Sequence, residues 1–132
     1  MELFDKYFEE LQEDLKYDQI NILEKQLALP AIKHKWVARL IRLKIEKENL
    51  EKQKKNIKSE VFKKLESEGI PTGVPKAALN AKIDSSDSVK TIEEKIKDID
   101  LLVQYLEKIE KVFSSVTYDI GNATKLMVLE TT

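Results

Sequence analysis

The sequence of 132 residues has no cysteine, one histidine, three glycines and three prolines. Without cysteine the chain can form neither disulfides nor thiolate metal sites, and it has no thiol nucleophile. The shortage of glycine and proline leaves few breaks between elements, which favours long helices. No apolar run approaches the roughly 20 residues that a membrane-spanning helix needs. The acidic start MELFDKYFEE also lacks the basic and apolar regions of a secretory signal. We therefore expect a cytoplasmic protein with no membrane partner.

Residues for catalysis are also scarce. The single histidine, His34, lies between Lys33 and Lys35. No serine, aspartate or cysteine stands in a context that would make it a partner for His34. The carboxylates are distributed as ordinary helix surface and not at metal-ligand spacing, and the glycines are too scattered for a phosphate-binding loop. We predict that the protein is not an enzyme and needs neither a metal nor a cofactor.

Charge is abundant but sorted by segment. Residues 33–64 contain 12 Lys or Arg and four Glu, a net charge of +8, whereas the whole chain carries −1. This segment has no Gly or Pro and is rich in good helix formers, so it predicts one basic helix over residues 30–66. A row of cations along a helix suits a phosphate backbone. The candidate DNA-binding residues are Lys35, Arg39, Arg42, Lys52, Lys54, Lys55, Lys58, Lys63 and Lys64.

Two interpretations of the basic helix stay open. Trp36 stands beside several cations and could stack a nucleic-acid base, but it also begins an apolar stripe and is typical of a core residue. Charged helix surface is usually only solvated, and acidic residues of the facing helix could neutralise some lysines. The candidates are Glu93, Glu94, Asp98, Asp100, Glu107 and Glu110. The charge pattern alone therefore favours neither DNA binding nor a coiled-coil scaffold or holdase that grips a protein.

The remaining pattern predicts an all-α fold in a single domain. Residues 1–29 form two short helices: one over 2–16, and one that Asp18 caps and Pro30 ends. Glycines and prolines mark residues 67–87 as a loop, with a turn of helix near 76–82. Residues 88–130 form the last helix and an apolar tail.

Two apolar seams indicate a long antiparallel helical hairpin, similar to a coiled coil. In the basic helix Leu43, Leu50 and Ile57 recur every seven residues, with Lys47 and Lys54 between them. These lysines must either reach outward to water or meet acidic partners across the seam. The last helix carries its own stripe: Ile92, Ile96, Ile99, Val103, Leu106 and Phe113. Folding the hairpin sets Leu50 opposite Val103 and Trp36 opposite Thr117.

A second apolar stripe on the last helix is wider than one neighbouring helix can cover. Either the N-terminal helices or another copy of the chain must cover it. An apolar C-terminus is unlike ordinary solvated surface, so we predict that it is a subunit contact. The candidate oligomerisation residues are Leu102, Tyr105, Ile109, Val112, Val116, Ile120, Leu126, Met127 and Leu129.

The order of these features resembles the UvsY family, the recombination mediator proteins of tailed bacteriophages. Three segments carry the resemblance: LALPAIKHKW at 27–36, the Lys-rich helix after it, and IEEKIKDIDLLVQYLEKIEKVFSSVTYDIGNA at 92–123. They match the family's junction before the basic helix, the basic helix itself, and the C-terminal helix that ends in Thr-Tyr-x-Ile-x-Asn-Ala.

The resemblance implies a homo-oligomeric ring of six or seven subunits that binds single-stranded DNA. It also implies that the protein loads a RecA-like recombinase onto DNA covered by single-strand-binding protein. In the family, a Lys-x-Arg pair in the basic helix is tied to DNA binding. Here Lys58 stands at the lysine position and Glu60 replaces the arginine, with Lys54, Lys55, Lys63 and Lys64 nearby. The family's C-terminal region is implicated in oligomerisation.

Overall fold

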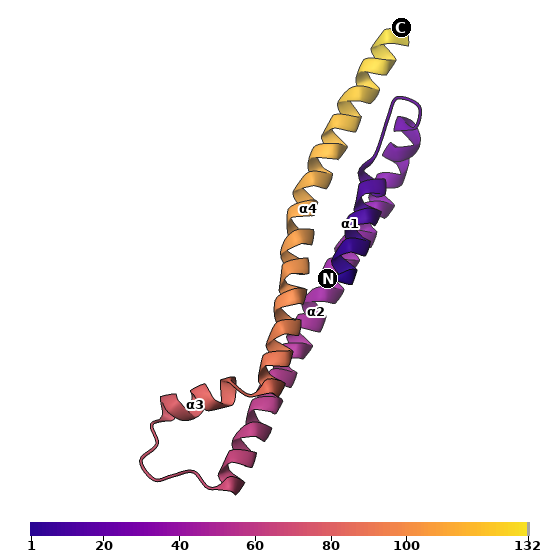
Figure 1. Ribbon diagram of the computed structural model, residues 1–132. Helices are drawn as coiled ribbons and strands as arrows, with labels where there is room; N and C mark the ends of the chain where they lie inside the picture. Colours follow the sequence, from indigo (N-terminus) through magenta and orange to yellow (C-terminus); the bar gives the residue numbers. More distant parts are fainter. Residues whose placement is uncertain (132) are drawn as a thin grey trace. The chain divides into compact units, whose positions relative to one another are not determined.

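The computed structural model describes residues 1–131 and contains four helices. They are α1 (Glu2–Leu15), α2 (Ile22–Glu68), α3 (Lys76–Asp84) and α4 (Asp87–Thr131) (Figure 1). No strand occurs in this described part, which confirms the predicted all-α class. The internal contacts group into two compact units: unit 1 comprises Met1–Arg42 with Leu102–Thr132, and unit 2 comprises Leu43–Leu101. Helices α2 and α4 contribute to both units.

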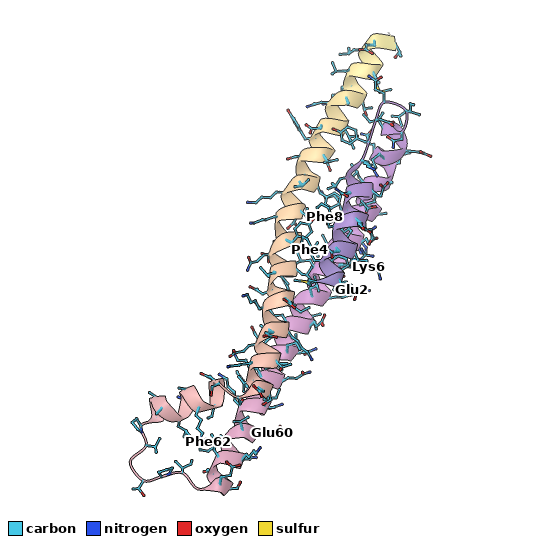
Figure 2. All side chains as sticks on the ribbon, in the orientation of Figure 1. Glu2, Phe4, Lys6, Phe8, Glu60 and Phe62 are labelled. Carbon is cyan, nitrogen blue, oxygen red and sulfur yellow. The ribbon has the colours of Figure 1, made fainter. Side chains whose placement is uncertain are left out.

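Unit 1 packs α1 and the first part of α2 with the second part of α4. The ring centroids of Phe4 and Tyr105 lie 4.9 Å apart, and Leu11 is 1% exposed. Figure 2 shows Phe4 and Phe8 directed toward α4, with Glu2 and Lys6 on the other side of α1. Helix α1 thus covers the part of the second α4 stripe that includes Tyr105. This agrees with one of the two alternatives predicted from the sequence, in which the N-terminal helices cover the stripe.

Helix α2 runs through Pro30 without a break, so the predicted end of a short helix at this residue is wrong. Proline lacks the N–H that would bond to the carbonyl of Gln26, and its ring crowds that carbonyl. The buried residues Ile22, Leu29 and Trp36 recur every seven residues on either side of Pro30. Keeping all three against the core of unit 1 requires a helix that continues, and this burial outweighs the local cost of the proline.

The connection between α1 and α2 is closed by a reciprocal pair of hydrogen bonds. Oδ1 of Asp18 accepts from the backbone N–H groups of Ile20 and Asn21, both at 2.9 Å. Oδ1 of Asn21 accepts from the backbone N–H of Asp18 at 2.7 Å. This arrangement resembles a capping box and satisfies N–H groups just before α2 begins at Ile22. Asp18 therefore caps the turn that leads into α2.

Unit 2 pairs the second part of α2 with the first part of α4 in antiparallel orientation. Two ion pairs join the helices: Lys47 to Asp100 at 2.7 Å and Lys54 to Glu93 at 3.1 Å. The predicted hairpin direction is right, but the predicted register, with Leu50 opposite Val103, is shifted by about six residues. Heptad seams tolerate a shift near seven because apolar positions still meet apolar positions.

The segment between α2 and α4 is only partly a loop. Helix α3 occupies residues 76–84, longer than the single turn that the sequence predicts there. Gly69 follows the end of α2 with φ of 89°, a left-handed conformation that favours glycine after a helix. Its backbone N–H donates to the carbonyl of Glu66 at 3.1 Å. Gly73 also has a positive φ, of 85°. Two glycines thus make the turn between α2 and α3.

Candidate nucleic-acid interface

Three lysines in the second part of α2 form a row on the side away from the hairpin seam. At about 100° per residue, Lys52, Lys55 and Lys63 lie roughly 140–160° around the helix from the seam residue Leu50. All three are exposed, and none makes an ion pair with any residue in 1–131. We call these three residues the outward lysine stripe. Its charge is available to an external anion.

The length of the outward lysine stripe and the residues beside it suit a polyanion with regularly spaced charges. Lys52 and Lys63 are separated by about 16 Å along the helix axis at 1.5 Å per residue. Asn56 and Ser59 lie on the same face between them and are exposed, so they can donate hydrogen bonds to phosphate oxygens. The stripe thus offers cations and neutral donors along one line, as a flexible phosphate backbone requires.

A second set of lysines lies beside the seam and is ion-paired. Lys47 and Lys54 bind Asp100 and Glu93, so the predicted alternative of acidic partners across the seam is confirmed for both. The side chain of Lys54 is 29% exposed and that of Glu93 is 41% exposed. Such partly solvated pairs contribute about 0–1 kcal/mol each. A phosphate could replace the carboxylate at little cost.

Lys58, one of the predicted DNA-binding residues, is paired with Asp84 at the end of α3. The Nζ–Oδ1 distance is 2.9 Å, and the side chains are 37% and 51% exposed. Glu60, two residues further along α2, is exposed. In Figure 2, Glu60 and Phe62 lie on different sides of α2, with Phe62 on the side of the loop and α3. Lys58 is therefore held by a carboxylate that is open to solvent.

Two of the predicted DNA-binding residues in unit 1, Lys35 and Arg39, are ion-paired to α1. Nζ of Lys35 lies 3.0 Å from Oε1 of Glu10 and 2.7 Å from Oδ2 of Asp14. Arg39 binds the other carboxylate oxygen of Glu10 and lies over the Trp36 ring, 4.6 Å from its centroid. We call Glu10, Asp14, Lys35 and Arg39 the α1–α2 ion cluster. These contacts hold α1 against α2.

The titration of this cluster reflects its pairing. The hydrogen bond from Arg39 lowers the pKa of the Glu10 carboxyl, helped by Lys35 and opposed by burial. Burial acts to lower the pKa of Lys35, but hydrogen bonds to Asp14 and Glu10 outweigh it and leave that pKa raised. Both shifts stabilise the charged forms that bind each other.

Trp36 is a core residue. It is 4% exposed, and its indole N–H donates to Oδ2 of Asp14 at 2.7 Å. The ring of Tyr7 meets it edge-on with centroids 5.3 Å apart. Of the two roles that the sequence left open, the structure supports packing, because stacking a base needs an exposed ring face.

The other predicted DNA-binding residues are exposed, and two further lysines join them. Arg42 and Lys64 make no ion pair within residues 1–131. Lys90 and Lys97 on α4 are also exposed and stand seven residues apart, on the same face of their helix. Both lie outside the basic segment 33–64, so its charge density does not point to them. Their seven-residue spacing away from the apolar stripe is the signal that identifies them.

The predicted oligomerisation residues fall into three groups by exposure. Leu102 and Ile120 are buried within one chain, and Tyr105, Ile109, Val116 and Met127 are half-buried. Val112 is 41% exposed, Leu126 60% and Leu129 69%. The solvent-accessible part of this set is therefore concentrated at the end of α4.

Residues 1–131 contain no group of three or more His, Cys, Asp or Glu side chains placed to hold a metal ion. None of the helices in this range combines the length and apolarity needed to cross a membrane.

The fold and the exposed lysines define a class: all-helical proteins whose cations follow one outward helix face. The family model described as "Recombination, repair and ssDNA binding protein UvsY" matches residues 10–131, so the chain belongs to the UvsY family. A search of curated proteins found no match.

Solved structures show the same fold. The chain is similar to a crystal structure of the bacteriophage T4 recombination mediator protein UvsY in lattice type IV. The TM-score is 0.81 at 15% identity, over 96% of this chain and 97% of that one. A second crystal structure of the same protein, in lattice type II, gives a TM-score of 0.79 at 16% identity over 97% of both chains.

Proposed function

We propose that this chain is a recombination mediator that binds single-stranded DNA through the outward lysine stripe of α2. The observation that carries the proposal is the exposure of Lys52, Lys55 and Lys63 without a carboxylate partner in residues 1–131. Lys54 and Lys58 add to this interface by exchanging their carboxylates for phosphates. Lys35 and Arg39 stay in the α1–α2 ion cluster and support the fold.

The family supports the further steps of the proposal. The protein forms a homo-oligomer, which multiplies the weak grip of a single stripe by effective concentration. It then promotes loading of a RecA-like recombinase onto DNA covered by single-strand-binding protein, within the phage-infected bacterial cytoplasm. Binding free energy drives this exchange without catalysis or a cofactor.

The test is a salt titration of binding to a fluorescent oligonucleotide. The variant carries Lys52→Ala, Lys55→Ala and Lys63→Ala together. Each phosphate contact on a single strand contributes about 0.7 to the slope of log affinity against log salt, so the slope should fall by about 2. The matched control changes three exposed lysines of unit 1, Lys6, Lys108 and Lys111, to Ala. It removes the same charge and should leave the slope nearly unchanged.

Two results would overturn the proposal. One is binding by the unaltered protein that is absent or insensitive to salt. The other is an equal loss of slope in both triple variants, because net charge and not the stripe would then be responsible.

A second candidate function is a coiled-coil scaffold or holdase that grips a protein. The exposed aliphatic residues Leu23, Leu27 and Ile41 on α2 favour it, since such surface often marks a protein contact. The mass of the assembly in solution with and without single-stranded DNA separates the two functions. An oligomer that neither binds nor responds to DNA would support the scaffold.

A further inference from the structure

Two glutamates border the outward lysine stripe, one on each side. At about 100° per residue, Glu51 and Glu60 lie roughly 90° around α2 from the centre line of the stripe, in opposite directions. Both are exposed, and neither makes an ion pair with a residue in 1–131. They are separated by about 14 Å along the helix axis, so together they flank most of the length between Lys52 and Lys63. The cations of the stripe therefore face outward between two unpaired carboxylates.

The cations nearest to these glutamates do not neutralise them. Lys58, on the Glu51 side of α2, is already paired with Asp84 at 2.9 Å. Lys64, on the Glu60 side, lies about 40° further around the helix, toward the hairpin seam. Along the length of the stripe, each flank thus presents a carboxylate closer to the lysines than any unpaired cation.

A single strand and a duplex would meet these flanks differently. A single strand has one phosphate backbone, which can follow the stripe and leave both flanks empty. If the stripe follows one backbone of B-form DNA, the other backbone lies about 6 Å away across the minor groove and about 12 Å away across the major groove. If α2 enters the major groove instead, the phosphates of both walls face its two flanks. In either position, phosphates of a second strand approach Glu51 or Glu60.

We propose that Glu51 and Glu60 make the outward lysine stripe selective for single-stranded over double-stranded DNA. Like charges brought together in a contact discriminate against the wrong partner. The inference rests on the proposed function and deepens it. The lysines supply the attraction for one backbone, and the two glutamates repel a second one.

The size of the effect follows from the repulsion between exposed charges. Two unit charges about 7 Å apart in water repel each other enough to change a binding constant about threefold. Two such contacts should disfavour a duplex by about five- to tenfold at low ionic strength. Salt at about 0.15 M shortens the screening length to about 8 Å, so the selectivity should decrease as salt is added.

The test compares the affinities for a fluorescent single-stranded oligonucleotide and for a blunt-ended duplex of the same length, at about 20 mM salt, where screening is weak. The variant carries Glu51→Gln and Glu60→Gln. The matched control carries Glu48→Gln and Glu66→Gln, at exposed positions that lie beyond the two ends of the stripe and within about 30° of its centre line. Each pair has one glutamate four residues before a stripe lysine and one three residues from Lys63, so both variants lose the same charge and equivalent neighbours within the helix.

We expect the variant with Glu51→Gln and Glu60→Gln to bind the duplex about five- to tenfold more tightly, with at most about a twofold gain for the single strand. The control should change both affinities alike and preserve their ratio. Circular dichroism checks that both variants are as helical as the unaltered protein. Equal ratios in the two variants, or an unaltered protein that binds the duplex as tightly as the single strand, would overturn the proposal.

The same titrations separate this inference from the proposed function. Salt-dependent binding of the single strand with a ratio that neither variant changes would remove the role of the glutamates and leave the lysine stripe in place. An unaltered protein that does not bind the single strand would overturn both.

Discussion

The indole N–H of Trp36 donates to Oδ2 of Asp14 at 2.7 Å, and this hydrogen bond ties α2 to α1. The same oxygen accepts from Nζ of Lys35 at 2.7 Å. Trp36 is the only tryptophan of the chain, so its fluorescence reports on this contact. Part of the positive charge of the basic helix therefore stabilises the packing of α1 on α2. The fluorescent side chain of Trp36 lies at this contact.

Acid should weaken this contact through Glu10. The pKa of Glu10 is lowered in the folded protein from its usual value of 4.5, chiefly by Arg39. Its stabilising effect is therefore complete above pH 4.5 and is lost as the pH falls through the lower folded-state pKa. We expect Glu10→Gln to reduce the dependence of unfolding free energy on pH below about 4.5, measured by urea denaturation with Trp36 fluorescence.

The matched control is Glu9→Gln, an exposed neighbour with no ion pair in residues 1–131. It should leave the pH dependence close to that of the unaltered protein. A Glu10→Gln variant with the full acid dependence would show that the α1–α2 ion cluster does not contribute to stability.

Replacing Pro30 should stabilise the protein. In a helix interior, proline costs about 3 kcal/mol relative to alanine. Pro30→Ala restores an N–H donor toward the carbonyl of Gln26 within the unbroken helix α2. We expect a gain of about 1–3 kcal/mol in the free energy of unfolding by urea. Pro71→Ala, in the loop after α2, should instead cost up to about 1 kcal/mol, because it only adds freedom to the unfolded chain. A loss of stability in Pro30→Ala would contradict a continuous helix.

Pro30 also shows one limit of predicting the fold from the sequence. Local preference at Pro30 predicts a break, but the seven-residue repeat of Ile22, Leu29 and Trp36 crosses it, and burial decides the outcome. The repeat could be read from the sequence, whereas its weight against the proline depends on the core that it meets. The register has a similar limit, because heptad seams permit several alignments and the pairing of Lys47 with Asp100 selects one.

The candidate site, like the fold, could be predicted from the sequence only in part. Lysine positions around a helix follow from their spacing, so the outward lysine stripe could be located from the sequence once the seam was known. The ion pairs of Lys35 and Arg39 could not be predicted from the sequence. Their partners Glu10 and Asp14 come from a separate helix whose docking site is set by tertiary packing. Charge density therefore indicates a basic segment, and only the fold separates its available cations from its paired ones.

Two glycines should respond to alanine in opposite directions. Gly69 has φ of 89°, which strains any residue with a Cβ, although no atom lies within 4 Å of the added carbon. Gly69→Ala should therefore cost about 1–2 kcal/mol. Gly121 lies inside α4 with the same open surroundings and no positive φ. Gly121→Ala should gain about 0.5–1 kcal/mol because alanine loses less backbone entropy. Urea denaturation of the pair measures both, and a loss in Gly121→Ala would indicate a close contact at that position.

The ion pair between Lys58 and Asp84 leads to a prediction about the affinity for single-stranded DNA. A phosphate that binds Lys58 must displace the Asp84 carboxylate, which lies 2.9 Å away and is 51% exposed. Asp84→Asn removes this competitor while keeping the size of the side chain. Because a partly exposed pair contributes about 0–1 kcal/mol, affinity for single-stranded DNA should rise by up to about fivefold, with stability changed by less than about 1 kcal/mol. Fluorescence anisotropy at fixed salt measures the affinity.

The control for Asp84→Asn must separate this local competition from the overall charge. Asp98→Asn removes the same charge from an exposed position of α4 in unit 2, where no ion pair to Asp98 exists within residues 1–131. If Lys58 contacts the phosphate backbone, Asp84→Asn should strengthen binding clearly more than Asp98→Asn, and Lys58→Ala should abolish the difference. Equal gains from both aspartate variants would mean that only long-range attraction changed. The Lys58–Asp84 pair would then stabilise α3 against α2 without taking part in DNA binding.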